Sequence, residues 1–174
     1  MRIRTLLALA VVTAAPVAAQ EHAMAGSGFG DIKPLQTQFM GWVLAAAEQM
    51  PEADYSYKPT PAVRSFGGLV GHVANANFAF CAGAKSEASP ATADYEKIAG
   101  KAELVAGLKA AIAYCETAFA MPHGKEHEAA SVFGMKGSRL WVLTFNISHN
   151  AEHYGNIVTY MRMKGMTPPS SQGG

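Results

Sequence analysis

The chain has 174 residues, of which 49% are apolar and 16% are charged, a composition typical of one globular domain rather than of a disordered segment. Lys and Arg number 14 against 13 Asp and Glu, and no run of like charges occurs. Nucleic acids and anionic lipid surfaces attract proteins with clustered positive charge, so we expect no nucleic acid partner and no polybasic membrane anchor.

The first twenty residues differ from the rest of the chain. Arg2 and Arg4 precede a mainly apolar stretch over residues 6–15, and small residues follow it. This pattern is typical of a secretory signal peptide over residues 1–20, because its apolar core is shorter than the roughly 20 residues that a membrane-spanning helix needs. We expect cleavage at the end of that segment, no membrane insertion afterwards, and a location outside the cytoplasm, periplasmic if the source is Gram-negative. The alternative is an uncleaved anchor.

The segment after the predicted cleavage site leads into a first helix. Residues 21–30 contain three glycines and little that could pack, so they are predicted to be a flexible lead. Apolar residues recur at intervals of three and four over residues 31–50, which predicts an amphipathic helix with Asp31 as its N-cap. Pro51 ends that helix, and the segment to Arg64 has no helical period, so we expect an ordered loop.

Three more helices follow. Ser65 is predicted to cap a helix that ends near Gly83, and its early glycines indicate close approach of a neighbouring helix. A connection leads to a third helix over residues 101–121, and a fourth follows the cap at Ser138 and ends near Lys164. The fold class is therefore all-α, a four-helix bundle without a sheet.

Two connecting or terminal segments are predicted to be irregular. Residues 123–137 are broken by glycines and read as a loop, in which residues 131–133 could form a brief extended stretch. The tail over residues 170–174 is predicted to be disordered. The bundle domain is thus expected to span residues 31–169.

Cys81 and Cys115 are the two cysteines, and they form no CxxC motif. A thiolate zinc site or redox motif is therefore not supported. Export would permit a disulfide between them, whereas each also lies in an apolar helical segment where a free Cys acts as a small hydrophobe. Both interpretations stay open at this point.

Three of the six histidines lie where a metal site could form. His149 and His153 are four residues apart in the fourth predicted helix, so both imidazoles project from one face and can reach one ion. His72 lies on the apolar stripe of the second helix, where burying an unpaired imidazole would be costly. Three neutral imidazoles would leave a coordination position open for a water or an external ligand, with Glu152 or Asn156 as supporting residues.

Other interpretations of these histidines remain open. His72 could be a hydrogen-bonded core residue, with His149 and His153 paired by accident. The sequence from His149 to His153 also has the HxxEH pattern of inverted zincins, with Glu152 as general base, but no Asp or Glu follows that could be the further ligand. Peptidase chemistry is therefore disfavoured.

Two motifs resemble the DinB superfamily of small metal-binding bundles, which is distinct from the DNA polymerase of similar name. The first is SFGGLVGHVAN at residues 65–75, and the second is HNAEHYGNIVTY at residues 149–160. The stretch Tyr57-Lys58-Pro59 fits as well. The resemblance implies an up-down-down-up bundle with a long crossover between helices 2 and 3, and a divalent metal held by three histidines, which correspond to His72, His149 and His153.

The implied topology also bears on the cysteines. Helices 2 and 3 would run parallel, which places Cys81 and Cys115 at similar heights, so that a disulfide becomes geometrically reasonable if their faces meet.

Characterised members of this superfamily are thiol-dependent S-transferases and isomerases that use bacillithiol, mycothiol or glutathione. Those thiols are chiefly cytoplasmic, so an exported member is expected to use water or another ligand. The resemblance thus favours a metal-dependent hydrolase or S-transferase-like enzyme with Glu152 as the proton-transfer residue, acting on an unidentified small molecule. The alternative is a non-catalytic metal-binding or stress-related envelope protein. Zn or Ni is expected first among metals, with Mn or Fe also compatible, and a homodimer stays open.

Overall fold

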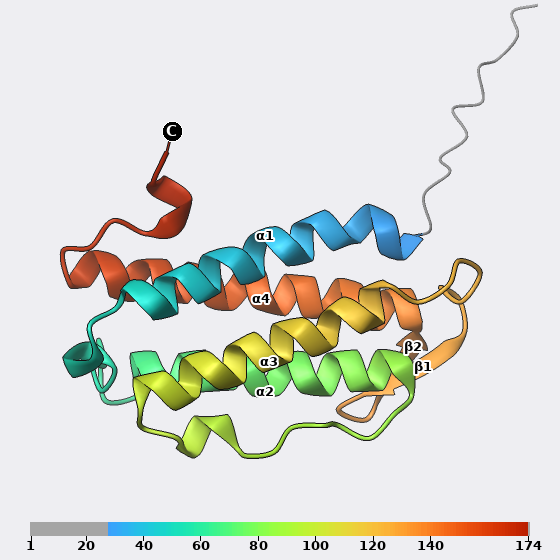
Figure 1. The fold of residues 1–174 in the computed structure, drawn as a ribbon, viewed down its shortest axis with the longest axis horizontal. Coiled ribbons are helices and arrows are strands. Elements are labelled where there is room, and N and C mark those ends of the chain that lie inside the picture. Colours follow the sequence, from blue (N-terminus) through green and yellow to red (C-terminus); the bar gives the residue numbers. More distant parts are fainter. Residues whose placement is uncertain (1–27, 174) are drawn as a thin grey trace, which may run out of the picture.

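Four helices make up the body of the protein. The computed structural model describes residues 28–173, so the predicted signal peptide at residues 1–20 lies outside the described residues. The four long helices are α1 (Gly28–Gln49), α2 (Phe66–Lys85), α3 (Lys101–Phe119) and α4 (Arg139–Met163). Figure 1 shows that α1 and α4 run in one direction and that α2 and α3 run in the other, which confirms the up-down-down-up order. None of the described helices is long and apolar enough to cross a membrane.

A long crossover joins α2 to α3 and packs along the bundle (Figure 1). It contains a short 3-10 helix, η2 (Tyr95–Lys97), which lies directly on two glycines. A Cβ atom at Gly71 would lie 2.3 Å from the Tyr95 carbonyl oxygen, and one at Gly107 would lie 2.0 Å from the Tyr95 ring. Asn75 fixes the same segment, because its side chain accepts from the Tyr95 N–H and donates to Asp94. The close approach predicted at Gly71 is thus real, but its neighbour is the crossover rather than another long helix.

The helix α1 begins three residues earlier than predicted. Residues 28–30 were expected to belong to a flexible lead, with Asp31 as the N-cap, but they form the first turn of α1. The reason is Phe29, which is completely buried in the apolar cluster that includes Val142 and Leu143 of α4. Burial of one large side chain stabilises a turn that contains two glycines of low helix propensity.

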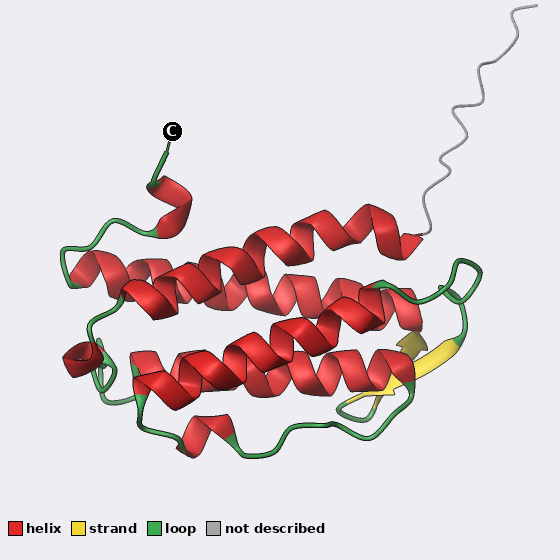
Figure 2. Ribbon diagram, in the orientation of Figure 1, coloured by secondary structure: helices red, strands yellow, loops and turns green. Residues whose placement is uncertain are grey.

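The prediction of no sheet is wrong for the segment before α4. It forms a two-stranded antiparallel hairpin from β1 (Ala129–Val132) and β2 (Met135–Ser138), shown in yellow in Figure 2. The extended stretch expected near residues 131–133 belongs to β1, except that Phe133 lies in the turn. Phe133 and Gly134 both have positive φ, the backbone conformation of the tight turns that connect such strands.

The tail is ordered where it is described, contrary to the prediction. A short 3-10 helix, η3 (Pro169–Ser171), follows α4, and the Ser170 N–H donates to the Tyr154 hydroxyl at 2.8 Å. The Gln172 side chain also pairs with the side-chain amide of Gln49 at the end of α1. A second short 3-10 helix, η1 (Glu52–Asp54), follows α1.

A buried layer of side-chain amides separates two apolar clusters of the core. Three helices contribute to this layer, in which every member is buried: Gln36 from α1, Asn77 from α2, and Asn146 and Asn150 from α4. On each of these helices the amide lies between residues of one cluster and residues of the other. Each amide oxygen accepts at least one hydrogen bond from another member of the layer.

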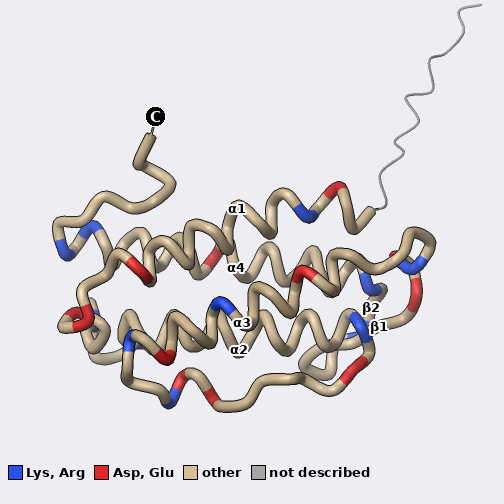
Figure 3. The backbone as a smooth tube through the Cα atoms, in the orientation of Figure 1, with Lys and Arg blue, Asp and Glu red and all other residues tan. Residues whose placement is uncertain are grey.

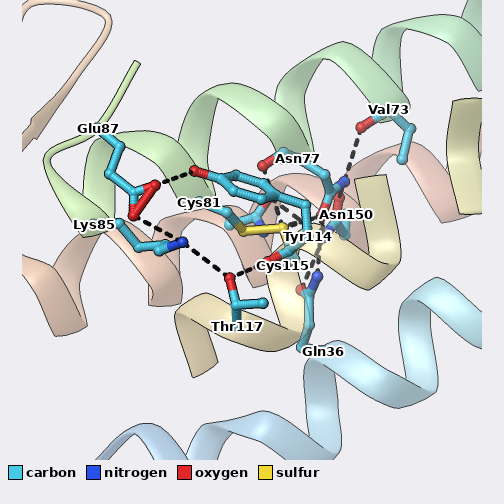
Figure 4. The surroundings of a disulfide bond; sticks show 11 residues. Gln36, Val73, Asn77, Cys81, Lys85, Glu87, Tyr114, Cys115, Thr117 and Asn150 are labelled. Atoms are coloured by element: carbon cyan, nitrogen blue, oxygen red, sulfur yellow. Dashed lines mark hydrogen bonds and ion pairs between the residues drawn. A yellow bond between two sulfur atoms is a disulfide. The ribbon is translucent and has the colours of Figure 1, made fainter. Parts of the chain in front are cut away.

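The disulfide lies beside this amide layer. Cys81 of α2 and Cys115 of α3 are bonded, with 5.3 Å between their Cα atoms, and Figure 4 shows the bond next to Asn77. The parallel course of α2 and α3 brings the two cysteines to the same height, as the implied topology required. Along residues 28–173, acidic and basic residues are interspersed (Figure 3).

Candidate metal centre

The helices α2 and α4 each begin at a serine cap that fixes the helical phase. The Ser65 hydroxyl accepts from the Gly68 N–H at 3.0 Å, and the Ser138 hydroxyl accepts from the Trp141 N–H at 3.1 Å. The two helices pack side by side in antiparallel orientation. This arrangement brings a side chain from one turn of α2 opposite two side chains from successive turns of α4.

The three predicted histidines meet at this contact. His149 Nε2 lies 3.2 Å from His72 Nε2 and 3.0 Å from His153 Nε2. The three ligand nitrogens all lie within 4.8 Å of one another, and they form a group of side chains that could hold a metal ion. His153 is buried, and the other two are partly buried. The structure therefore brings together the residues that the sequence predicted to be ligands.

A carboxylate from the crossover orients His72. Glu96 Oε1 lies 2.7 Å from His72 Nδ1, and its other oxygen accepts from Arg64 Nε at 2.9 Å. In a neutral His72 this contact assigns the proton to Nδ1 and leaves a lone pair on Nε2, facing the other two histidines. A carboxylate behind a ligating histidine is a common support in metal sites, because it fixes the tautomer and raises the basicity of the ligand.

The donor set fits a divalent cation. His149 Nε2 faces two other ring nitrogens, so a single N–H at this position would have to donate to both of them. The other ring nitrogen, His149 Nδ1, is buried without a hydrogen-bond partner among residues 28–173. Protonation on Nδ1 instead would leave lone pairs facing one another. A cation at the centre accepts all three lone pairs. Tetrahedral zinc bound by nitrogens at roughly 2.0–2.1 Å would separate those nitrogens by about 3.3 Å, close to the two separations found here.

The electrostatics favour the neutral forms of His149 and His153. Burial, followed by the neighbouring His153 and His72, lowers the pKa of His149 to about 4. Burial and the adjacent His72 also lower the pKa of His153. Partial burial acts to raise the pKa of Glu96, but hydrogen bonds from His72 and Arg64 outweigh it and hold that pKa below its usual value. Metal ligation requires neutral imidazoles, so the lowered pKa values of His149 and His153 favour it.

The two supporting residues predicted from the sequence lie near His153. The side-chain amide nitrogen of Asn156 lies 3.4 Å from His153 Nδ1, and turning this amide over would present its oxygen as an acceptor for an Nδ1–H. Glu152 is exposed and lines the same pocket as His153, and its carboxylate makes no hydrogen bond within residues 28–173. The loop residue His123 lies outside the cluster and contacts Glu126 instead.

A pocket opens beside the cluster at His153. Its volume is about 650 Å³, and it lies between α4 and the loop that precedes α2. Its lining includes Glu152, His153 and Asn156 from α4, together with Lys58 and Arg64 from the loop. The site is therefore accessible to a small molecule from this side.

Glu96 and Arg64 are the residues that the sequence analysis missed. Glu96 lies 24 residues beyond its partner His72, in a connection without periodicity, and no motif marks it. The only signal is indirect: Gly71 beside His72 indicates a close approach, which the crossover makes.

The fold and the site define a small helical bundle with a three-histidine cluster that could hold a metal ion. The family model of the DinB superfamily matches residues 42–157, more than half of the chain. The protein belongs to the DinB superfamily. A crystal structure of a DinB-like protein from Bacillus cereus ATCC 10987 is similar in fold, with a TM-score of 0.69 and 18% identity over 79% of this chain and 93% of that chain. No curated protein matches the chain.

Proposed function

We propose that this protein is an exported, metal-dependent enzyme of the DinB type that acts on a small molecule. The observation that carries the proposal is the convergence of three histidine Nε2 atoms next to an open pocket. His72, His149 and His153 are the proposed ligands, and Zn or Ni is the expected metal, with Mn or Fe also compatible with imidazole ligands.

The bound ion would supply a Lewis acid with an open coordination position. The protein's own residues supply the rest. Glu96 holds His72 in the tautomer whose Nε2 points at the cluster. Glu152 can take a proton from an attacking water or thiol and return it to the leaving group, since its carboxylate lines the pocket next to His153. Hydrolysis and thiol transfer can both use a Lewis acid and a residue that transfers protons.

The pocket favours an enzyme over a metal buffer. A storage or sensing site can be closed and saturated by protein ligands, whereas catalysis needs an exchangeable position and space for a substrate. Only three ligand side chains converge within the described part of the chain, and the pocket reaches one of them, His153. The non-catalytic metal-binding protein remains the alternative that the experiment below would reveal.

Export is supported by the sequence of residues 1–20 and by the disulfide between Cys81 and Cys115. Disulfides persist in oxidising compartments such as the periplasm and are rare in the cytosol. An exported location favours water over a low-molecular-weight thiol as the co-reactant.

The test is a comparison of mature protein loaded with Zn or Ni against the same protein after chelation. Both are screened for ester, amide and phosphoester hydrolysis and for thiol transfer to an electrophile. We expect metal-dependent turnover that Glu152→Gln lowers in kcat without loss of metal, while Glu87→Gln on the crossover leaves it unchanged. Bound metal with no turnover in any assay, and no ligand exchange at the ion, would indicate the non-catalytic protein.

A further inference from the structure

The charges in the pocket are divided between its two sides. The loop before α2 contributes the cations Lys58 and Arg64, whereas α4 contributes Glu152 next to His153. No other charged side chain lines this pocket. The pocket therefore combines two cations with the residues proposed to carry out the chemistry.

Both cations retain free donors. Arg64 uses Nε for Glu96, and among residues 28–173 its two terminal nitrogens make no hydrogen bond. The side chain of Lys58 is exposed and has neither a hydrogen bond nor an ion pair within the same part of the chain, although Glu152 lines the same pocket.

The bond between Arg64 and Glu96 also fixes the direction of the guanidinium. Glu96 holds Nε while its second oxygen contacts His72, so the arginine is tied to the metal cluster through one carboxylate. A guanidinium held at Nε presents its terminal nitrogens as a fork, which matches the two oxygens of a carboxylate or phosphate group.

We propose that the pocket selects substrates that carry a carboxylate or phosphate group, which Arg64 and Lys58 bind while the reacting bond lies toward His153 and Glu152. This inference rests on the proposed function for the reaction itself, but anion binding by these two cations does not need the metal. The two cations of the pocket can therefore be tested in the metal-free protein.

The experiment measures binding of formate and inorganic phosphate by NMR titration, to both metal-free and metal-loaded protein, with acetamide as a neutral probe. Wild-type protein is compared with Lys58→Gln, Arg64→Gln and the control Lys136→Gln, an exposed lysine on β2 outside this pocket. We expect Kd for the anions to rise about fivefold or more in the first two variants and to stay unchanged in the control. Acetamide should not bind, and added salt should weaken anion binding.

Comparison of the two anions shows which group the pocket prefers. Tighter binding of formate would indicate a carboxylate on the substrate, and tighter binding of inorganic phosphate would indicate a phosphate. Lys58→Gln changes an exposed loop residue, so its result does not depend on the stability of the fold. Anion binding that neither Lys58→Gln nor Arg64→Gln weakens, or no anion binding by metal-free wild-type protein, would overturn the inference. The metal content of the same samples reports on the proposed function separately.

Discussion

The bundle contains two polar clusters in its interior, and they differ in how completely their atoms are paired. In the amide layer, Asn77 donates to Asn150, Asn150 donates to Gln36, and Gln36 donates back to Asn77, which closes a ring. In the histidine cluster, three ring nitrogens face one another, and His149 Nδ1 has no partner among the described residues. A polar cluster whose hydrogen bonds are all made within it stabilises the fold, whereas one whose ring nitrogens converge could hold a metal ion.

Substitution in the amide layer is expected to have the largest effect on stability. Asn77→Leu would leave buried donors of Gln36 and Asn146 without their acceptor, so we expect a loss of about 3–5 kcal/mol in the free energy of unfolding. In metal-free protein, His149→Leu should cost at most about 1 kcal/mol, because no complete hydrogen-bond network is lost. Urea denaturation of both variants measures the difference, and equal losses would contradict the distinction between the two clusters.

Removal of the disulfide is expected to have the second largest effect on stability. Its cysteines are 34 residues apart, and the entropy of closing such a loop predicts a loss of about 3–4 kcal/mol for the double variant Cys81→Ser/Cys115→Ser. Thermal and urea denaturation measure this loss. Metal content should not change, since neither cysteine belongs to the histidine cluster. Loss of metal from a folded double variant would contradict the separation of the two regions.

A substitution at Gly71 should affect the site from a distance. The added Cβ of Gly71→Ala would meet the Tyr95 carbonyl and displace the crossover that carries Glu96, so we expect a loss of about 1–3 kcal/mol in stability and weaker metal binding. Gly155→Ala in α4 is the control, because nothing lies within 4 Å of its Cβ position. That control should be neutral or stabilising by up to about 1 kcal/mol. Equal behaviour of the two variants in denaturation and metal titration would refute this role of the crossover.

The substitution with the smallest expected effect on stability removes the carboxylate of Glu96. Glu96→Gln keeps an acceptor for His72 Nδ1–H but removes the charge, so we expect metal affinity to fall about 10-fold with little change in stability. Glu87→Gln, in the same crossover, should bind metal as the wild type does. Competition with a chromophoric chelator measures both affinities, and unchanged affinity in Glu96→Gln would show that this contact does not support the ligand.

The sequence predicts the helical framework and the histidines because both depend on local periodicity. Spacings of three and four define the four helices, and the spacing of four places His149 and His153 on one face. The apolar stripe of the second helix already marks His72 as a candidate, but its approach to the other two histidines depends on tertiary packing, which only the family resemblance implied.

Features built from long-range contacts could not be predicted in the same way. Glu96 reaches His72 through an irregular connection, and the hairpin strands are too short for a recognisable alternation. The amide layer that buries Asn146 could not be predicted either, since single amides on an apolar face do not reveal their partners in other helices. The burial of Phe29, which starts α1 early, also depends on α4.

The most direct test of the account is the metal content of mature protein purified without a His tag. His72→Ala and His149→Ala are compared with His123→Ala, which changes a histidine outside the cluster, and circular dichroism checks the fold of each. The account predicts about one equivalent of metal in the wild type and in His123→Ala, and its loss in the two cluster variants. Folded wild-type protein that contains no metal and takes up neither added Zn nor added Ni would contradict it.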